Sequence, residues 1–262
     1  GHGPKAWIHA REGRLLAAAE ERFARAADTT LLISENEANL FRTRVSNMDQ
    51  IDLQVMRNGI DATFFAPDAV KPEPTLYGPG PNLVFTGQMD YAPNVAAVER
   101  MAQRILPAIR EVHRNAEFHI VGRAPTPAVK TLAKRAGVTV WGEVPDVRPY
   151  LAEADIVVAP LMIARGIQNK VLEAMAMAKP VVLSPEAATG IDADDGVHFA
   201  IAEGDRMIAG RALALIDDRA KARAMGDAAR AFVLEQQSWP AMLACLGDLL
   251  HPSAIDAVRD AA

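Results

Sequence analysis

The chain has 262 residues, of which half are hydrophobic and 23% are charged, and its formal net charge is −5. This composition is typical of a soluble globular protein, and the acidic balance argues against a nucleic-acid-binding protein, which usually carries a basic excess. No apolar run reaches the roughly 18 residues needed to cross a bilayer. The single cysteine, Cys245, cannot form an internal disulfide, which favours a reducing, cytoplasmic location.

The first 60 residues predict one small helix–strand–helix–strand unit. A helix is expected over residues 12–27, a strand over 30–34 and a short strand over 54–56. Ser34 and Glu37 have the spacing of a capping box, which predicts a second helix between the strands. One such unit cannot cover both faces of a sheet, so these residues are interpreted as the tail of another α/β domain.

The next segment has the composition of a linker, because residues 66–81 contain five prolines and two glycines. The predicted organisation is therefore a domain remnant over residues 4–61, a linker over 62–82 and a larger domain over 83–237. Residues 238–262 are expected to form a C-terminal helix and a tail. In the layout discussed below, that helix would cross back to the first domain, although packing on its own sheet is nearly as good an account.

Beyond residue 82, strand-like and helix-like segments alternate. Strands are expected at 83–86, 118–122, 138–142, 155–160, 180–183 and 197–201. Helices are expected at 94–111, 126–136, 147–154, 168–178, 219–237 and 239–250, with the last two separated by a break near Pro240. Pro107 should kink the first of these helices or end it early. The strands are short apolar runs rich in β-branched residues, which predicts a parallel sheet buried on both faces. The fold class is thus α/β, with a doubly wound, Rossmann-like sheet and a ligand crevice at its carboxyl edge.

The most informative segment surrounds the start of the helix predicted at 168–178. Gly166, Ile167, Gln168 and Asn169 precede or open this helix, whose free N–H groups and dipole suit a diphosphate. Arg165 and Lys170 could add charge-assisted hydrogen bonds, and Glu173 lies one turn along, where it could accept from two ribose hydroxyls. From the residues alone, an ordinary capped helix with a solvated lysine and glutamate is the alternative.

Other candidate ligand contacts follow the predicted strands. Gly87 would allow a phosphate to approach the backbone closely, and Arg123 could reach a phosphate or lie free on the surface. The turn at Gly142, Glu143 and Val144 could present backbone groups to a nucleobase, although a simple turn explains it equally well. Asn94 could shape a sugar pocket or cap a helix.

The sequence gives little indication of a bound metal ion or cofactor. No His or Cys pair has the spacing of metal ligands. The glycine pattern of dinucleotide-binding domains is also absent from the first strand–helix turn of the larger domain. We therefore expect no metal and no cofactor, and the charge of an anionic ligand would be met by the helix end and basic side chains.

Several segments in this order resemble the family 4 retaining glycosyltransferases of GT-B architecture. The strongest is Gly166-Ile167-Gln168-Asn169-Lys170-Val171-Leu172-Glu173-Ala174-Met175-Ala176, and the others include 33–37, 58–61, 85–87, 121–123, 142–146, 154–160 and 179–182. Together with Met89-Asp90-Tyr91 and Pro93-Asn94, these motifs are most similar to those of sugar transferases from bacterial exopolysaccharide systems of the PEP-CTERM type. The resemblance covers about residues 12–245.

The sequence departs from this family in two places. The family usually has a second glutamate upstream of the one matched by Glu173, and Arg165 occupies that position. Many members also place an arginine and a lysine after the first strand of this half, where this chain has Gln88-Met89-Asp90-Tyr91. If the resemblance holds, the donor's charge must be met differently, and Arg165 and Lys170 are the candidate catalytic residues.

The resemblance implies a nucleotide-diphosphate-sugar donor and a polysaccharide or lipid-linked acceptor. It places most of the acceptor-binding domain, with its usual catalytic histidine, before residue 1, so an N-terminally truncated chain of low activity is expected. It also allows a peripheral contact with the inner face of the membrane through that missing domain. Two alternatives remain: a nucleotide-sugar-binding module without catalysis, and a non-hydrolysing nucleotide-sugar 2-epimerase, for which no convincing acid–base carboxylates are present.

Overall fold

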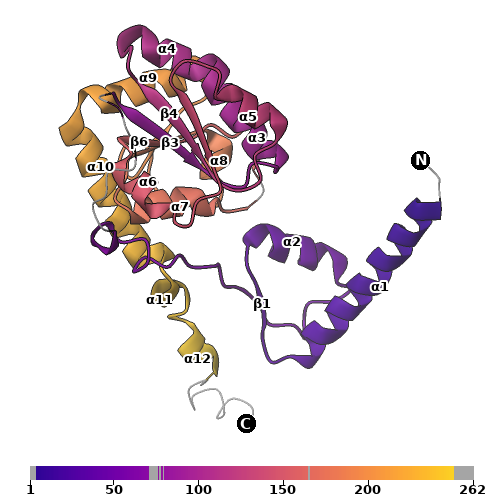
Figure 1. Cartoon of the computed structure of the whole chain (residues 1–262). Helices are drawn as coiled ribbons and strands as arrows, with labels where there is room; N and C mark the ends of the chain where they lie inside the picture. Colours follow the sequence, from indigo (N-terminus) through magenta and orange to yellow (C-terminus); the bar gives the residue numbers. More distant parts are fainter. Residues whose placement is uncertain (1–3, 71–75, 77, 79, 165, 251–262) are drawn as a thin grey trace. The chain divides into compact units, whose positions relative to one another are not determined.

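The computed structural model describes residues 4–70, 76, 78, 80–164 and 166–250 of the chain. Its contacts divide the protein into two compact units (Figure 1). The first unit consists of Gly1–Gly59 with Met242–Ala262, and the second of Ile60–Ala241. In the described part of the chain, none of the helices combines the length and the hydrophobicity that a membrane span requires.

The first unit is small, and its first helix begins earlier than the expected start at residue 12. Its N-terminal elements are α1 (Pro4–Ala26), β1 (Thr30–Leu32), α2 (Glu35–Arg44) and β2 (Leu53–Val55), and its C-terminal part contains α12 (Leu246–Leu250). The two strands pair in parallel. The hydroxyl oxygen of Ser34 accepts a hydrogen bond from the N–H of Glu37 at 3.2 Å, as the capping pattern predicts. Ala24, Phe41 and Ile51 form a modest core.

The second unit is built on a six-stranded parallel sheet with the order β5-β4-β3-β6-β7-β8. The strands are β3 (Asn82–Thr86), β4 (Glu117–Val121), β5 (Val138–Gly142), β6 (Ile156–Ala159), β7 (Val181–Leu183) and β8 (Ala200–Ile201). Within this sheet, the chain begins at the central strand β3 and proceeds outward through β4 to β5. It then returns to β6, beside β3, and continues through β7 to β8. This order confirms the predicted doubly wound α/β fold, and its switch point lies between β3 and β6.

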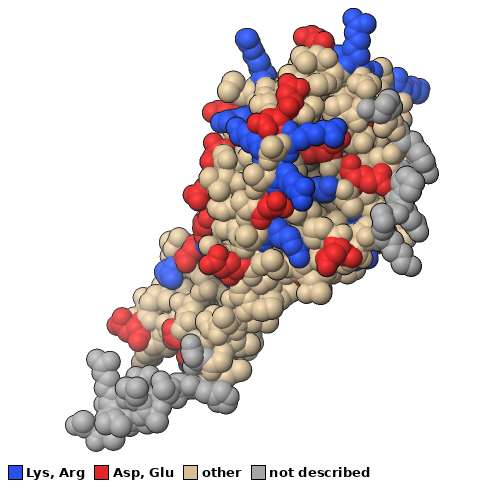
Figure 2. Space-filling view, turned by 90° about the vertical axis from the view of Figure 1, so that its left-hand side faces the viewer, with Lys and Arg blue, Asp and Glu red and all other residues tan. Residues whose placement is uncertain are grey.

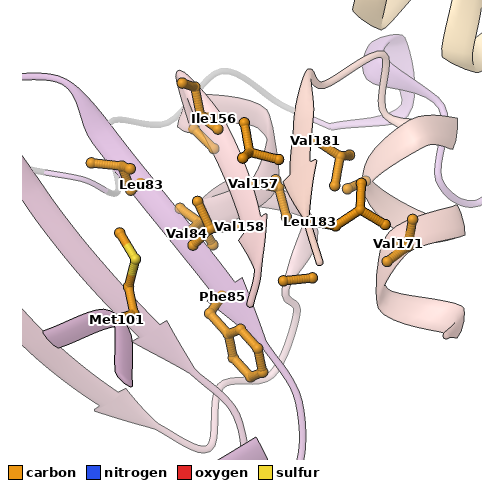
Figure 3. Close-up of a cluster of buried hydrophobic side chains, with 14 of the residues drawn as sticks. Leu83, Val84, Phe85, Met101, Ile156, Val157, Val158, Val171, Val181 and Leu183 are labelled. Atoms are coloured by element: carbon orange, nitrogen blue, oxygen red, sulfur yellow. The ribbon is translucent and has the colours of Figure 1, made fainter. Parts of the chain in front are cut away.

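The strands at the centre of the sheet are buried on both faces. Every residue of β6 and β7 is buried, and so is every residue of β3 after Asn82. Figure 3 shows the side chains of these three strands packed together with Val171 of α7. Burial of this kind requires helices on both faces of a parallel sheet, and it explains why the strands read as continuous apolar runs.

The helices of the second unit cover both faces of the sheet (Figure 1). They are η1 (Pro67–Ala69), α3 (Ala92–Arg100), η2 (Met101–Ile105), α4 (Leu106–Val112), α5 (Pro127–Leu132), α6 (Arg148–Glu153), α7 (Asn169–Ala176), α8 (Pro185–Ala188), α9 (Asp205–Asp217), α10 (Arg219–Phe232) and η3 (Val233–Gln237). Short α11 (Trp239–Met242) lies at the boundary with the first unit.

Pro107 does not end its helix, because the preceding turn is wider than an α-helical turn. Within η2, the N–H of Leu106 donates to the carbonyl of Met101, five residues earlier. Such a π-helical turn interrupts the regular hydrogen-bond ladder just before the proline, which itself has no N–H to donate. The helix therefore continues through α3, η2 and α4 to Val112.

Part of the segment predicted to be a linker packs against other elements of the second unit. The N–H of the buried Leu76 donates to a carboxylate oxygen of Glu153 at 2.6 Å. The guanidinium of Arg148 stacks 3.7 Å from the centre of the Phe64 ring and donates to the Phe64 carbonyl at 3.0 Å. A carboxylate oxygen of Asp146 accepts a hydrogen bond of 2.7 Å from the Nη2 atom of the same guanidinium. These contacts attach the segment to α6 and to the loop before it.

Candidate functional site

A pocket of about 480 Å³ opens at the carboxyl ends of β3, β4 and β5, beside the start of α7. This is the edge at which doubly wound sheets bind ligands. Its walls come from four strand–helix connections and from α7 itself. The lining residues are Thr86, Gly87, Gln88, Asn94, Gly122, Arg123, Glu143, Val144, Val147, Ile167, Asn169, Lys170 and Glu173.

Most of the site residues predicted from the sequence meet in this pocket. Nine of them line it: Gly87, Asn94, Arg123, Glu143, Val144, Ile167, Asn169, Lys170 and Glu173. Gly142, Gly166 and Gln168 are not among the lining residues. The carbonyl of Gly142 accepts from the N–H of Gly122 at 2.8 Å, and the side chain of Gln168 turns back to the carbonyl of Gly166 at 3.1 Å. Arg165 lies outside the described residues.

The floor of the pocket is a close approach of two glycines. Gly87 follows β3 with a φ of 153°, and Gly122 follows β4 with a φ of 148°. A Cβ on Gly122 would stand 1.7 Å from the carbonyl oxygen of Gly87, and a Cβ on Gly87 would stand 2.9 Å from Nδ2 of Asn94. Side chains are thus excluded from both positions, and backbone is exposed to a ligand at the end of the central strands.

The start of α7 faces the same space. The helix begins at Asn169, after Gln168, whose side chain makes no capping hydrogen bond. Its first turn contains no acidic residue, and Asn169 and Lys170 line the pocket. An uncapped helix start has N–H groups available to an anion, together with the positive end of the helix dipole.

Lys170 projects from α7 to the end of β3. Its ammonium donates a hydrogen bond of 2.5 Å to the Oδ1 of Asn94 and lies 4.5 Å from the centre of the Phe85 ring, which is at the carboxyl end of β3 (Figure 3). Burial lowers the pKa of Lys170 to about 8, and the nearby Glu173 carboxylate opposes this effect. The pocket therefore holds a cation that has lost much of its hydration.

Glu173 lies one turn beyond Asn169 on α7, where it also lines the pocket. Burial raises the pKa of its carboxyl group, and the positive charge of Lys170 opposes the shift. A carboxylate in this position can accept hydrogen bonds from two neighbouring hydroxyls of a ligand, which would compensate for its lost hydration.

The opposite wall comes from the ends of β4 and β5. The exposed guanidinium of Arg123 donates to the side-chain oxygen of Gln88 at 2.9 Å. Glu143 is exposed, whereas Val144 and Val147 are half-buried, so this wall combines an apolar surface with polar backbone groups. It could contact a flat nucleobase.

Four lining residues were not among the predicted site residues: Thr86, Gln88, Gly122 and Val147. A signal existed for Gly122, which ends a predicted strand at the expected crevice. Asn94 is not the helix cap that its position allowed. The cap of α3 is Tyr91, and Asn94 is a buried residue of the first turn, with its Nδ2 donating to the carbonyl of Gln88 at 2.9 Å.

Metal-binding side chains form no cluster in the part of the chain that the structure describes. No group of three or more His, Cys, Asp or Glu side chains there could hold a metal ion. His119 is buried, its ring nitrogens contact Asn82 at 3.1 Å and Trp141 at 3.3 Å, and burial lowers its pKa to about 4. On the surface shown in Figure 2, basic and acidic side chains lie next to one another.

Solved structures with the same fold include a glycosyltransferase, a sucrose-phosphate synthase and the protein HepE. A glycosyltransferase from Rickettsia africae shares 14% identity (TM-score 0.68) over 89% of this chain and 66% of its own. A sucrose-phosphate synthase from Thermosynechococcus elongatus shares 19% (TM-score 0.68) over 90% of this chain and 61% of its own. HepE from Anabaena, solved with UDP and glucose, shares 14% (TM-score 0.68) over 89% and 66%.

This chain therefore spans less than two thirds of the length of each of these three proteins. A comparison with curated proteins gives no match. A family model described as "Glycosyl transferases group 1", in contrast, matches residues 80–218. The matched region is just over half of the chain and contains the whole pocket at the carboxyl edge of the sheet. The chain belongs to the group 1 glycosyl transferases.

Proposed function

We propose that the pocket binds the nucleoside diphosphate part of a nucleotide-sugar donor. The observation that carries this proposal is the convergence of three features in one pocket: the start of α7, the ammonium of Lys170 and the carboxylate of Glu173. The first two suit the diphosphate, and the third suits the ribose diol. The turn after β5 would contact the nucleobase. A relative with the same fold, HepE, was solved with UDP-glucose, which supports a ligand of this class.

The proposed reaction is transfer of the donor's sugar to an acceptor. Negative charge grows on the diphosphate as the bond between sugar and phosphate breaks, so a fixed ammonium beside it stabilises the transition state more than the ground state. Lys170 would supply this charge, and Arg165 is proposed to add a second cation. Gly87 and Gly122 would let the sugar phosphate approach the backbone. The proposal requires no metal and no cofactor.

The finer parts of the proposal depend on the sequence resemblance. It supports membership of family 4, retention of configuration at the anomeric carbon, and a role in exopolysaccharide synthesis with a polysaccharide or lipid-linked acceptor. A fold relative, WaaG, is described as a glycosyltransferase involved in lipopolysaccharide biosynthesis, which is compatible with an acceptor of this kind.

The proposal can be tested by a thermal-shift screen with UDP, GDP, ADP and TDP and their sugar conjugates. A ligand that binds only the folded state raises the melting temperature by mass action. We expect one diphosphate to give a clear shift, Lys170→Met to abolish most of it, and Lys221→Met, on the exposed side of α10, to leave it unchanged. If none of the four nucleotides stabilises the chain, the proposed donor site is wrong.

A nucleotide-sugar-binding module without catalysis is the second candidate. Arg165 stands where the resemblance places a glutamate, and this substitution is the observation that favours it. Incubating the chain with the preferred nucleotide sugar, with and without glycan acceptors, separates the two. Binding without release of the diphosphate would favour the binding module.

A further inference from the structure

The buried side chain of Asn94 links three parts of the pocket. Its Oδ1 accepts from the ammonium of Lys170 at 2.5 Å, and its Nδ2 donates to the carbonyl of Gln88 at 2.9 Å. The residue is 5% exposed. The side-chain amide thus connects α7 to the loop that follows β3.

The two partners fix the orientation of this amide. An ammonium has only donors, so it must face the amide oxygen, and a backbone carbonyl has only lone pairs, so it must face the amide nitrogen. A reversed amide would lose both hydrogen bonds. The ammonium of Lys170 is therefore held at one place, and that place adjoins Gly87, where an added Cβ would lie 3.2 Å from Nζ.

We propose that Asn94 is a positioning residue, which holds the ammonium of Lys170 at the end of β3 for the diphosphate of the donor. The inference rests on the proposed donor site. An amide suits this task better than a carboxylate, because it accepts the hydrogen bond without neutralising the cation that the diphosphate needs. An aspartate at position 94 would also place a second acceptor oxygen against the carbonyl of Gln88.

The proposal predicts a specific pH dependence of binding. Lys170 is an ammonium below its pKa of about 8, so the affinity for a diphosphate should fall as the pH rises above this value. The other charged groups that line the pocket are Glu173 from α7, Arg123 after β4 and Glu143 after β5. The terminal phosphate of the ligand titrates near pH 6, and the ring N–H of uracil, guanine or thymine titrates above about pH 9, so measurements from about pH 7 to 8.5 report on the protein.

The test uses isothermal titration with whichever of UDP, GDP, ADP and TDP the wild-type chain binds most tightly. Asn94→Leu removes both hydrogen bonds at similar side-chain volume. We expect this variant to bind the nucleotide roughly tenfold more weakly than wild type at pH 7.5. The fall of its affinity with rising pH should also begin at a lower pH. Asn94→Asp should move the decline to a higher pH, because a carboxylate stabilises the ammonium. Asn82→Leu removes another, partly buried hydrogen bond at the opposite end of β3 and should change neither quantity.

A double-mutant cycle separates positioning from a general structural role. In a Lys170→Met background, Asn94→Leu should weaken binding by less than about twofold, because there is no ammonium left to hold. If Asn94→Leu weakens binding by the same factor at every pH, and by the same factor in the Lys170→Met background as in the wild type, Asn94 does not act through Lys170 and the inference is wrong. If Lys170→Met itself binds as tightly as wild type, or if wild type binds no nucleotide, the donor site fails and the inference fails with it.

Discussion

The carbonyl oxygen of Gly87 lies 1.7 Å from the point at which a Cβ atom of residue 122 would stand. The two glycines end neighbouring strands, and each has a φ that side-chain-bearing residues rarely adopt. This contact brings the backbones of β3 and β4 together at the floor of the pocket, with Lys170 and Asn94 directly above Gly87. The pocket depends on the absence of side chains as much as on the residues that line it.

Gly122→Ala should therefore destabilise the protein by about 3 kcal/mol or more, since the clash is with backbone and the φ is unfavourable. Urea unfolding followed by circular dichroism measures the change. Gly210→Ala is the matched control, because Gly210 lies in α9 with no atom within 4 Å of its added Cβ, and it should stabilise by about 0.5–1 kcal/mol. Equal stabilities of the two variants would contradict the close approach.

Glu173→Ala should weaken binding of the preferred nucleoside diphosphate roughly tenfold, or about 1.4 kcal/mol, through the lost contact with the ribose hydroxyls. Calorimetry measures the effect, and the deoxyribose form of the same nucleotide should bind the variant and the wild type more nearly equally. Glu186→Ala, on the exposed surface of α8, serves as the control. An unchanged affinity for Glu173→Ala would remove this residue from the site.

The lowered pKa of Lys170 makes the stability of the empty chain depend on pH. Burial lowers this pKa from 10.5 to about 8, so between these values the unfolded chain binds more protons than the folded one, and stability rises with pH. Below pH 8 the lysine is charged in both states and contributes no slope. The unfolding free energy of wild type minus that of Lys170→Met should consequently increase from pH 8 to pH 10. A constant difference would mean that Lys170 is well hydrated.

Thr86 has a buried hydroxyl with no hydrogen-bond partner among the described residues. Because an unpaired buried hydroxyl costs free energy, Thr86→Val should raise the stability of the chain by about 1 kcal/mol. Thr131→Val removes a hydroxyl that donates to the carbonyl of Pro127 at 2.8 Å and should bring no gain. Differential scanning calorimetry of both variants decides the matter; a less stable Thr86→Val would show that the hydroxyl has a partner.

The sheet of the second unit could be predicted because its strands are buried on both faces. Runs such as those of β6 and β7 have few alternatives to a central parallel strand. The glycines that follow β3 and β4 and the glycine that ends β5 marked the carboxyl edge. The π-helical turn at Met101–Ile105 was not predicted, since it depends on how a proline is accommodated in a helix that packs against the sheet. Periodicity alone indicated only that Pro107 would disturb the helix.

The pocket was predictable in its location and less so in its contacts. Lys170 was expected to interact with phosphate from the helix start, but its hydrogen bond to Asn94 depends on the distance between α7 and the loop after β3, which no local pattern encodes. For the same reason Asn94 had two equally good interpretations in the sequence. The side chain of Gln168 bonds to the carbonyl of Gly166 in its own loop, which its position in the sequence did not predict.

A crystal structure of the chain with its preferred nucleoside diphosphate tests the central claim most directly. The account predicts phosphate oxygens within hydrogen-bond distance of Nζ of Lys170 and of the backbone N–H groups that open α7, with both ribose hydroxyls on the carboxylate of Glu173. A nucleotide bound elsewhere, or a pocket that side chains fill when the nucleotide is present, would contradict it.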